Sequence, residues 1–94
     1  MPSTPTCLFI TSSWSVNSLK LIDIKQELES EYHDRLSFLC WDYDQLGPQL
    51  RMLYDIKAVP LIRLIKDQQI TFQQYGGIFS KAEIKGLIYS YLEL

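Results

Sequence analysis

A strand–helix–strand pattern at the start of the chain constrains the fold more than any other feature. Residues 7–10 form a compact apolar run typical of a buried strand. From residue 17 or 18 to residue 32, apolar side chains recur every three or four positions, which predicts an amphipathic helix. Residues 36–41 are apolar on both faces apart from Ser37, as in an interior parallel strand. A right-handed crossover then places the two strands side by side and parallel.

The second half of the chain predicts a short helix, two strands and a final helix. Gly47-Pro48 opens a helix ending near residue 54, with Leu50 and Leu53 as core contacts. Residues 59–66 and 70–75 read as strands, and their short connection implies an antiparallel hairpin. Residues 80–83 (Ser-Lys-Ala-Glu) form a capping box before the last amphipathic helix. The predicted order is β-α-β-α-β-β-α.

Composition narrows the class of protein. A chain of 94 residues suits a single domain, expected over residues 6–94 after a disordered lead at residues 1–5. Nine basic and eleven acidic residues give a net charge of −2, which does not favour nucleic acid or membrane as partner. Both Cys7 and Cys40 lie in apolar runs and are expected to be separate buried thiols. Such cysteine usage, without a basic and apolar leader, fits a cytoplasmic protein.

Four motifs in order resemble the thioredoxin superfamily. The first is residues 9–14, which lead into a helix, and the second combines residues 41–44, Gly47-Pro48 and residues 54–56. The third is Ala58-Val59-Pro60, and the fourth is residues 75–77 before the last helix. The resemblance covers nearly everything from Cys7 onward. It implies a minimal thioredoxin fold, an α/β domain whose mixed four-stranded sheet has helices on both faces. It also implies a cis bond between Val59 and Pro60.

The chain departs from that family where the family does its chemistry. Thiol–disulfide exchange needs a Cys-x-x-Cys pair at the start of the first helix, and Ser15 and Ser18 occupy those two positions here. A serine hydroxyl is too weakly acidic to replace a thiolate, so the chain as written cannot catalyse this exchange. The family's buried acid also falls on Phe9. No catalytic residue is therefore assigned.

Peptide binding does not require the cysteines. Thioredoxin folds bind extended chains beside the cis-proline, where backbone groups pair as in an added strand. The resemblance places this face at Trp14, Leu19, Val59, Pro60, Gly76 and Gly77, with Ile78 adjoining. We therefore expect a redox-inactive domain that binds a protein or peptide there, without a cofactor.

Two alternatives remain at this point. The first is a thiol–disulfide oxidoreductase whose two active-site cysteines have been replaced by Ser15 and Ser18, by nature or in the laboratory. The second is a homodimer formed through the strand at residues 70–75 or through the apolar loop face. No metal site is expected, since His33 is the single histidine and suits a helix end. Asp42 and Asp44 suit turn and capping roles.

Overall fold

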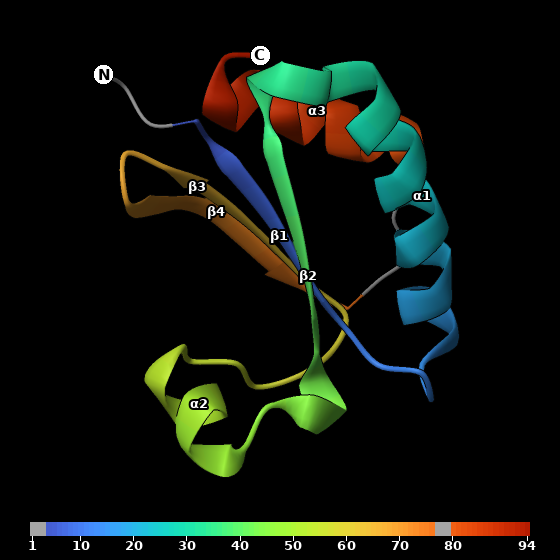
Figure 1. Ribbon diagram of the computed structural model, residues 1–94, viewed down its shortest axis with the longest axis vertical. Helices are drawn as coiled ribbons and strands as arrows, with labels where there is room; N and C mark the ends of the chain where they lie inside the picture. The colour runs from blue at the N-terminus through green and yellow to red at the C-terminus, as the bar shows by residue number, and fades with distance from the viewer. Residues whose placement is uncertain (1–3, 77–79) are drawn as a thin grey trace.

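The strand–helix–strand unit forms as the sequence predicts, within a minimal thioredoxin-like α/β fold (Figure 1). The computed structural model describes residues 4–76 and 80–94. The elements are β1 (Thr6–Thr11), α1 (Val16–Tyr32), β2 (Ser37–Asp42), α2 (Pro48–Leu53), β3 (Leu61–Lys66), β4 (Gln69–Tyr75) and α3 (Lys81–Leu92). Short 3-10 turns, His33–Arg35 and Tyr43–Gln45, flank β2.

The four strands form one mixed sheet in the order β2-β1-β3-β4. Strands β1 and β2 are parallel, as the crossover predicts, and β3 pairs antiparallel with both β1 and β4. The β3–β4 hairpin turns at Asp67 and Gln68, whose φ angles are 53° and 66°. Two adjacent residues with positive φ match the twist of a tight hairpin, even without glycine. The predicted hairpin is confirmed.

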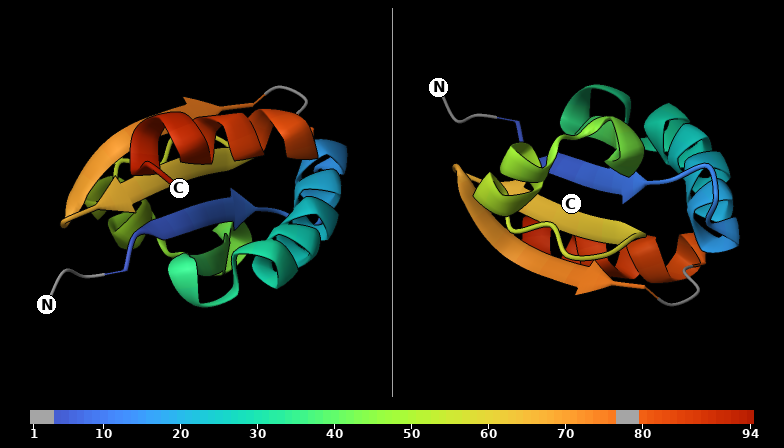
Figure 2. Two further views of the ribbon diagram at one scale, coloured as in Figure 1. Left: turned by 90° about the horizontal axis from the view of Figure 1, so that it is seen from above. Right: turned by 90° about the horizontal axis from the view of Figure 1, so that it is seen from below.

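Helices α1 and α3 lie on one side of the sheet and α2 on the other (Figures 1 and 2). The main core fills the space between the sheet and α1 with α3. Its members are the inward residues of β1, β3 and the two helices, together with the residue just before β2: Cys7, Phe9, Leu21, Leu28, Tyr32, Leu36, Ile62, Leu64, Ile84, Ile88 and Leu92. The apolar spacing of both helices therefore identified the correct buried faces.

The second face of the sheet is covered only in part. A small cluster of Leu8, Ile10, Ile56 and Leu61 is buried there. The predicted core contacts of α2 are wrong, because Leu50 and Leu53 are both exposed. Helix α2 is only six residues long and lies towards the end of the sheet, which leaves both leucines exposed.

Strand β2 is an edge strand, which corrects two expectations. Its neighbour in the described part of the chain is β1 alone. Leu39 and Cys40 are exposed, so the predictions of an interior strand and of a buried Cys40 thiol are both wrong. Cys7 is buried, as expected. An apolar pattern reports the hydrophobicity of a strand, but the sheet order decides whether both of its sides are covered.

No helix in the described ranges is long and apolar enough to cross a membrane. The N-terminal lead is described from Thr4, and the carbonyl of Pro5 accepts a hydrogen bond of 2.9 Å from Ser37 N–H. The lead thus runs alongside the start of β2. Residues 1–3 lie outside the described part of the chain.

Candidate functional site

Strand register brings three separate segments together at one end of the sheet. Ile10 on β1 is opposite Leu61 on β3, and Leu61 is opposite Tyr75 on β4. The loop after β1, the Val59–Pro60 bond before β3 and Gly76 after β4 therefore adjoin one another. A hydrogen bond of 2.8 Å from Gly76 N–H to the Pro60 carbonyl continues the β3–β4 ladder into this end. This is the face that the resemblance implied.

Trp14 is the most prominent side chain of this face. It is 65% exposed, yet its indole Nε1–H donates to Asp44 Oδ1 at 2.9 Å. The hydroxyl of the buried Ser12 donates to the other oxygen, Asp44 Oδ2, at 2.6 Å. These two donors, Ser12 first, lower the pKa of the Asp44 carboxyl. A carboxylate therefore fixes the direction of an exposed aromatic ring.

Asp44 is a site residue that sequence reasoning missed. Asp42 confirms the predicted capping role, because its Oδ1 accepts from Asp44 N–H at 2.9 Å and closes the turn after β2. This turn aims the Asp44 side chain at the loop after β1. The contact spans 30 residues, so only the alignment of parallel β1 and β2 reveals it.

The two serines at the redox positions are not equivalent. Ser15 is the N-cap of α1, and its Oγ accepts from Ser18 N–H at 3.3 Å. Ser18 is fully buried, and within the described part of the chain its Oγ has no hydrogen-bond partner. A buried hydroxyl without a partner is unfavourable, because it loses its hydrogen bonds to water. Position 18 is therefore better suited to a less polar group than to serine.

The remaining predicted residues frame the same face. The Val59–Pro60 bond is cis, as the resemblance implied, with Pro60 buried and Val59 half-buried. Among the described residues, the backbone N–H and C=O of Val59 have no hydrogen-bond partner. Leu19 is exposed on the first turns of α1, and Gly76 has a φ of 63°, which glycine adopts readily. Gly77 and Ile78 lie outside the described residues.

No thiol lies at the start of α1, so this face has no group for thiol–disulfide exchange. Phe9, at the position of the family's buried acid, is part of the main core. Burial raises the pKa of the Cys7 thiol to about 12, which keeps it protonated and unreactive. Cys40 is on the neighbouring strand, and both cysteines are free. In the described ranges, no three His, Cys, Asp or Glu residues gather as a metal site would require.

A buried arginine fixes the loop that leads to Pro60. Arg63 on β3 is buried, and its guanidinium donates to the carbonyls of Tyr54 at 2.7 Å and Asp55 at 3.3 Å. Its Nε donates to Gln73 Oε1 at 2.9 Å. The cation thus joins the end of α2 to the sheet through carbonyl groups. Sequence reasoning missed this residue, since an arginine in a strand usually faces water.

Comparison with known proteins supports the fold. No protein-family model matches this sequence, and no curated protein sequence does. A solved structure described as that of a malarial protein is similar, with a TM-score of 0.84 and 21% sequence identity. The match covers 96% of this chain and 99% of that chain. At such low identity the likeness establishes the shared minimal thioredoxin-like α/β architecture, and the function has to be argued from the residues themselves.

Proposed function

We propose that this chain is a redox-inactive member of the thioredoxin superfamily that binds an extended segment of a protein or peptide. The binding face consists of Trp14, Leu19, Val59, Pro60 and Gly76. The observation that carries the proposal is the Trp14 ring, which is exposed and yet held by Asp44, at the end of the sheet where the cis Val59–Pro60 bond also lies. An exposed aromatic ring of fixed orientation loses little conformational entropy when a partner covers it.

The backbone of Val59 supplies the second part of the argument. An extended segment lying along residues 58–60 can pair with the N–H and C=O of Val59, as in an added strand. Trp14 and Leu19 offer apolar surface on the α1 side of that segment. The expected ligand is thus an extended chain with apolar side chains, recognised by its backbone and by contact with the indole ring.

A peptide library displayed on phage, selected on the immobilised protein, tests this proposal. Trp14→Ala should abolish capture of the selected peptides. Tyr89→Ala is the matched control, because Tyr89 is an aromatic residue on α3 that is 73% exposed and outside this face. NMR shifts caused by a selected peptide should centre on Val59 and Gly76. Peptides that bind the Trp14→Ala and wild-type proteins equally would refute the assignment of this face.

One observation favours the oxidoreductase alternative as a second candidate. The unpartnered hydroxyl of buried Ser18 occupies a place where a thiol, which loses less on burial, fits better. Restoring both cysteines as Ser15→Cys/Ser18→Cys tests whether the scaffold supports the exchange. Insulin reduction by the double variant alone supports an oxidoreductase origin, and inactivity of both proteins refutes it. Cysteine codons at positions 15 and 18 in the source gene would show a laboratory replacement.

We further propose that the domain acts in the cytoplasm. Both cysteines are free, and Cys40 carries an exposed thiol that a reducing compartment would preserve. Fractionation of source cells with an antibody against the protein tests this placement. Recovery from an oxidising compartment would overturn it.

A further inference from the structure

We propose that two copies of this chain associate through the open edge of β2, with their β2 strands antiparallel. This interface differs from the peptide-binding face, and the proposal does not depend on it. It replaces the β4 edge, at residues 70–75, that the sequence suggested for a homodimer. The backbone, the side chains and the charges along β2 all favour this contact.

Among the described residues, β2 pairs with β1 on one side only, so its outward backbone groups are available to a second strand. Ser37 N–H points towards β1, since it donates to the Pro5 carbonyl. Successive residues of a strand direct these groups to alternate sides, so those of Phe38, Cys40 and Asp42 point away from β1. Residues 37–42 contain no Pro or Lys, and their pairing with β1 has no bulge. Apart from the charge of Asp42 at its end, the edge therefore lacks the usual devices that prevent pairing with another strand.

The opposite edge of the sheet is less suited to such pairing. The β3–β4 ladder has a register shift between Leu64 and Ile65, which makes the edge at β4 irregular. Gln73 and Gln74 are exposed on that strand, and Gln73 is engaged by Arg63. The regular and more apolar edge is thus β2.

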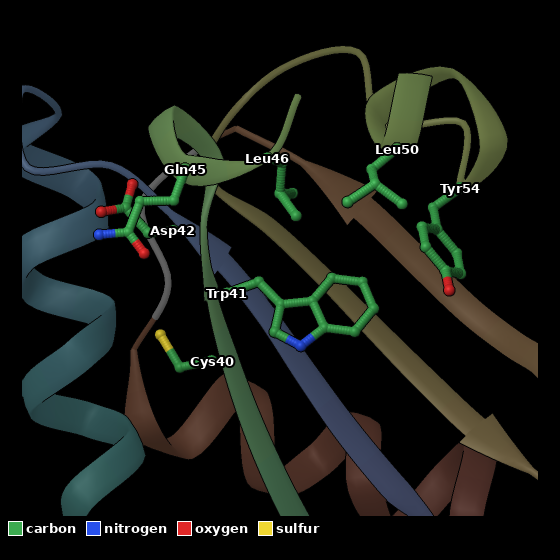
Figure 3. A pocket seen from close by; sticks show the side chains of 7 residues that line it. All are labelled: Cys40, Trp41, Asp42, Gln45, Leu46, Leu50 and Tyr54. Atoms are coloured by element: carbon green, nitrogen blue, oxygen red, sulfur yellow. The ribbon is translucent and has the colours of Figure 1, made fainter. Parts of the chain in front are cut away.

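The side chains on one face of β2 are complementary to themselves under a twofold axis. Leu39 is 44% exposed, and Trp41 is two residues further along the same face. Beside Trp41 lies an open pocket of about 420 Å³, also lined by Cys40, Asp42, Gln45, Leu46, Leu50 and Tyr54. Figure 3 shows Trp41, Leu46, Leu50 and Tyr54 directed towards a common space, with Cys40 on the other side of the strand.

A twofold axis at Cys40 brings the exposed Leu39 of each copy to the pocket beside Trp41 of the other. It places Leu39 of each copy opposite Trp41 of the other, at the mouth of the pocket. The same axis makes Cys40 face its counterpart in a hydrogen-bonded pair, in agreement with the outward direction of its N–H and C=O. The contact is isologous, so each copy provides one projecting leucine and one receiving pocket.

Charge favours the antiparallel arrangement over the parallel one. Arg35 precedes β2, and Asp42 closes it. Arg35 is exposed and donates to the Glu31 carbonyl at 3.2 Å, with its guanidinium 5.2 Å from the centre of the Tyr32 ring, so its charge has no carboxylate partner among the described residues. An antiparallel pair brings the Arg35 end of one copy towards the Asp42 end of the other. A parallel pair would instead set the two Asp42 carboxylates against each other, which is repulsive.

Sedimentation equilibrium over a range of protein concentrations tests the interface. The wild type should show a reversible monomer–dimer equilibrium. Leu39→Lys should raise the dissociation constant at least tenfold, because it places two ammonium groups at the pocket mouths. Ile70→Lys is the matched control, as Ile70 is 53% exposed on the β4 edge, and it should leave the dissociation constant unchanged. Circular dichroism melts of both variants establish that they are folded.

Cross-linking of the unmodified protein tests the axis without relying on a variant. The Cα atoms of a hydrogen-bonded antiparallel pair lie about 5.5 Å apart, within reach of a short bis-maleimide. The reagent should join two copies through Cys40, while Cys40→Ser should remove the cross-link and preserve the dimer in sedimentation. A monomer at all concentrations, or weakening by Ile70→Lys and not by Leu39→Lys, overturns the interface. A dimer sensitive to Leu39→Lys that does not cross-link overturns the axis at Cys40.

Discussion

Replacing Ser18 by alanine should stabilise this protein. Ser18 is fully buried in the first turn of α1, and its Oγ has no hydrogen-bond partner among residues 4–76 and 80–94. A buried polar group without a partner costs about 1–3 kcal/mol of stability, which the substitution recovers. Alanine also favours the helix by roughly 0.5 kcal/mol relative to serine. The small cavity left by the oxygen subtracts on the order of 0.5 kcal/mol.

The helix and cavity contributions nearly cancel, so the net gain expected for Ser18→Ala is about 1–3 kcal/mol in the free energy of unfolding. For a domain of this size, each kcal/mol shifts the Tm by roughly 4–8 °C. Guanidinium unfolding followed by circular dichroism measures the first quantity, and a thermal melt measures the second. The slope of the guanidinium transition should be unchanged, because the same surface is exposed on unfolding.

Ser15→Ala is the matched control, since it removes a hydroxyl from the same turn. The Oγ of Ser15 caps the helix by accepting from Ser18 N–H, so its loss should destabilise the protein by about 1 kcal/mol. The two substitutions should therefore have opposite signs. Destabilisation by Ser18→Ala would show that its hydroxyl makes a favourable hydrogen bond and would refute the reasoning.

Three further predictions concern other buried or constrained groups. The pKa of the Asp44 carboxyl is lower in the folded state than in the unfolded state, where it is about 3.9. The hydrogen bonds to Asp44 therefore stabilise the fold fully above the unfolded pKa, and this stabilisation is lost as the pH falls through the lower folded pKa. Fluorescence of Trp14 should therefore be constant from about pH 8 to 5 and change only below about pH 4, and Asp44→Asn should remove this change. Arg63→Leu should cost about 1.5–3 kcal/mol in urea unfolding, because the Tyr54 carbonyl loses its charged donor and the Asp55 carbonyl is left with the Tyr75 hydroxyl as donor; a cost near zero would contradict the assigned role. An aromatic disulfide reagent at pH 8 should modify Cys40 at once and Cys7 only after denaturation, and equal rates would disprove the burial of Cys7.

Local patterns in the sequence determined most of the secondary structure. The spacing of Leu21 and Leu28 identified the buried face of α1, and Ser80 caps α3 through Glu83 N–H as predicted. Such features depend on residues three or four positions apart, so the chain itself carries them. The resemblance also identified the Val59–Pro60 bond as cis before the structure showed it.

Contacts across the sheet were decided only by the tertiary structure. The exposure of Leu39 depends on β2 lying at an edge, which an apolar pattern cannot report. The hydrogen bond from Trp14 to Asp44 and that from buried Arg63 to the Tyr54 carbonyl join segments that only the tertiary fold brings together. Periodicity describes how hydrophobic a segment is, whereas the neighbours that a segment finds depend on how the whole chain packs. The sequence alone therefore determined the elements and the presence of serine at positions 15 and 18, and the packing decided which surfaces remain exposed.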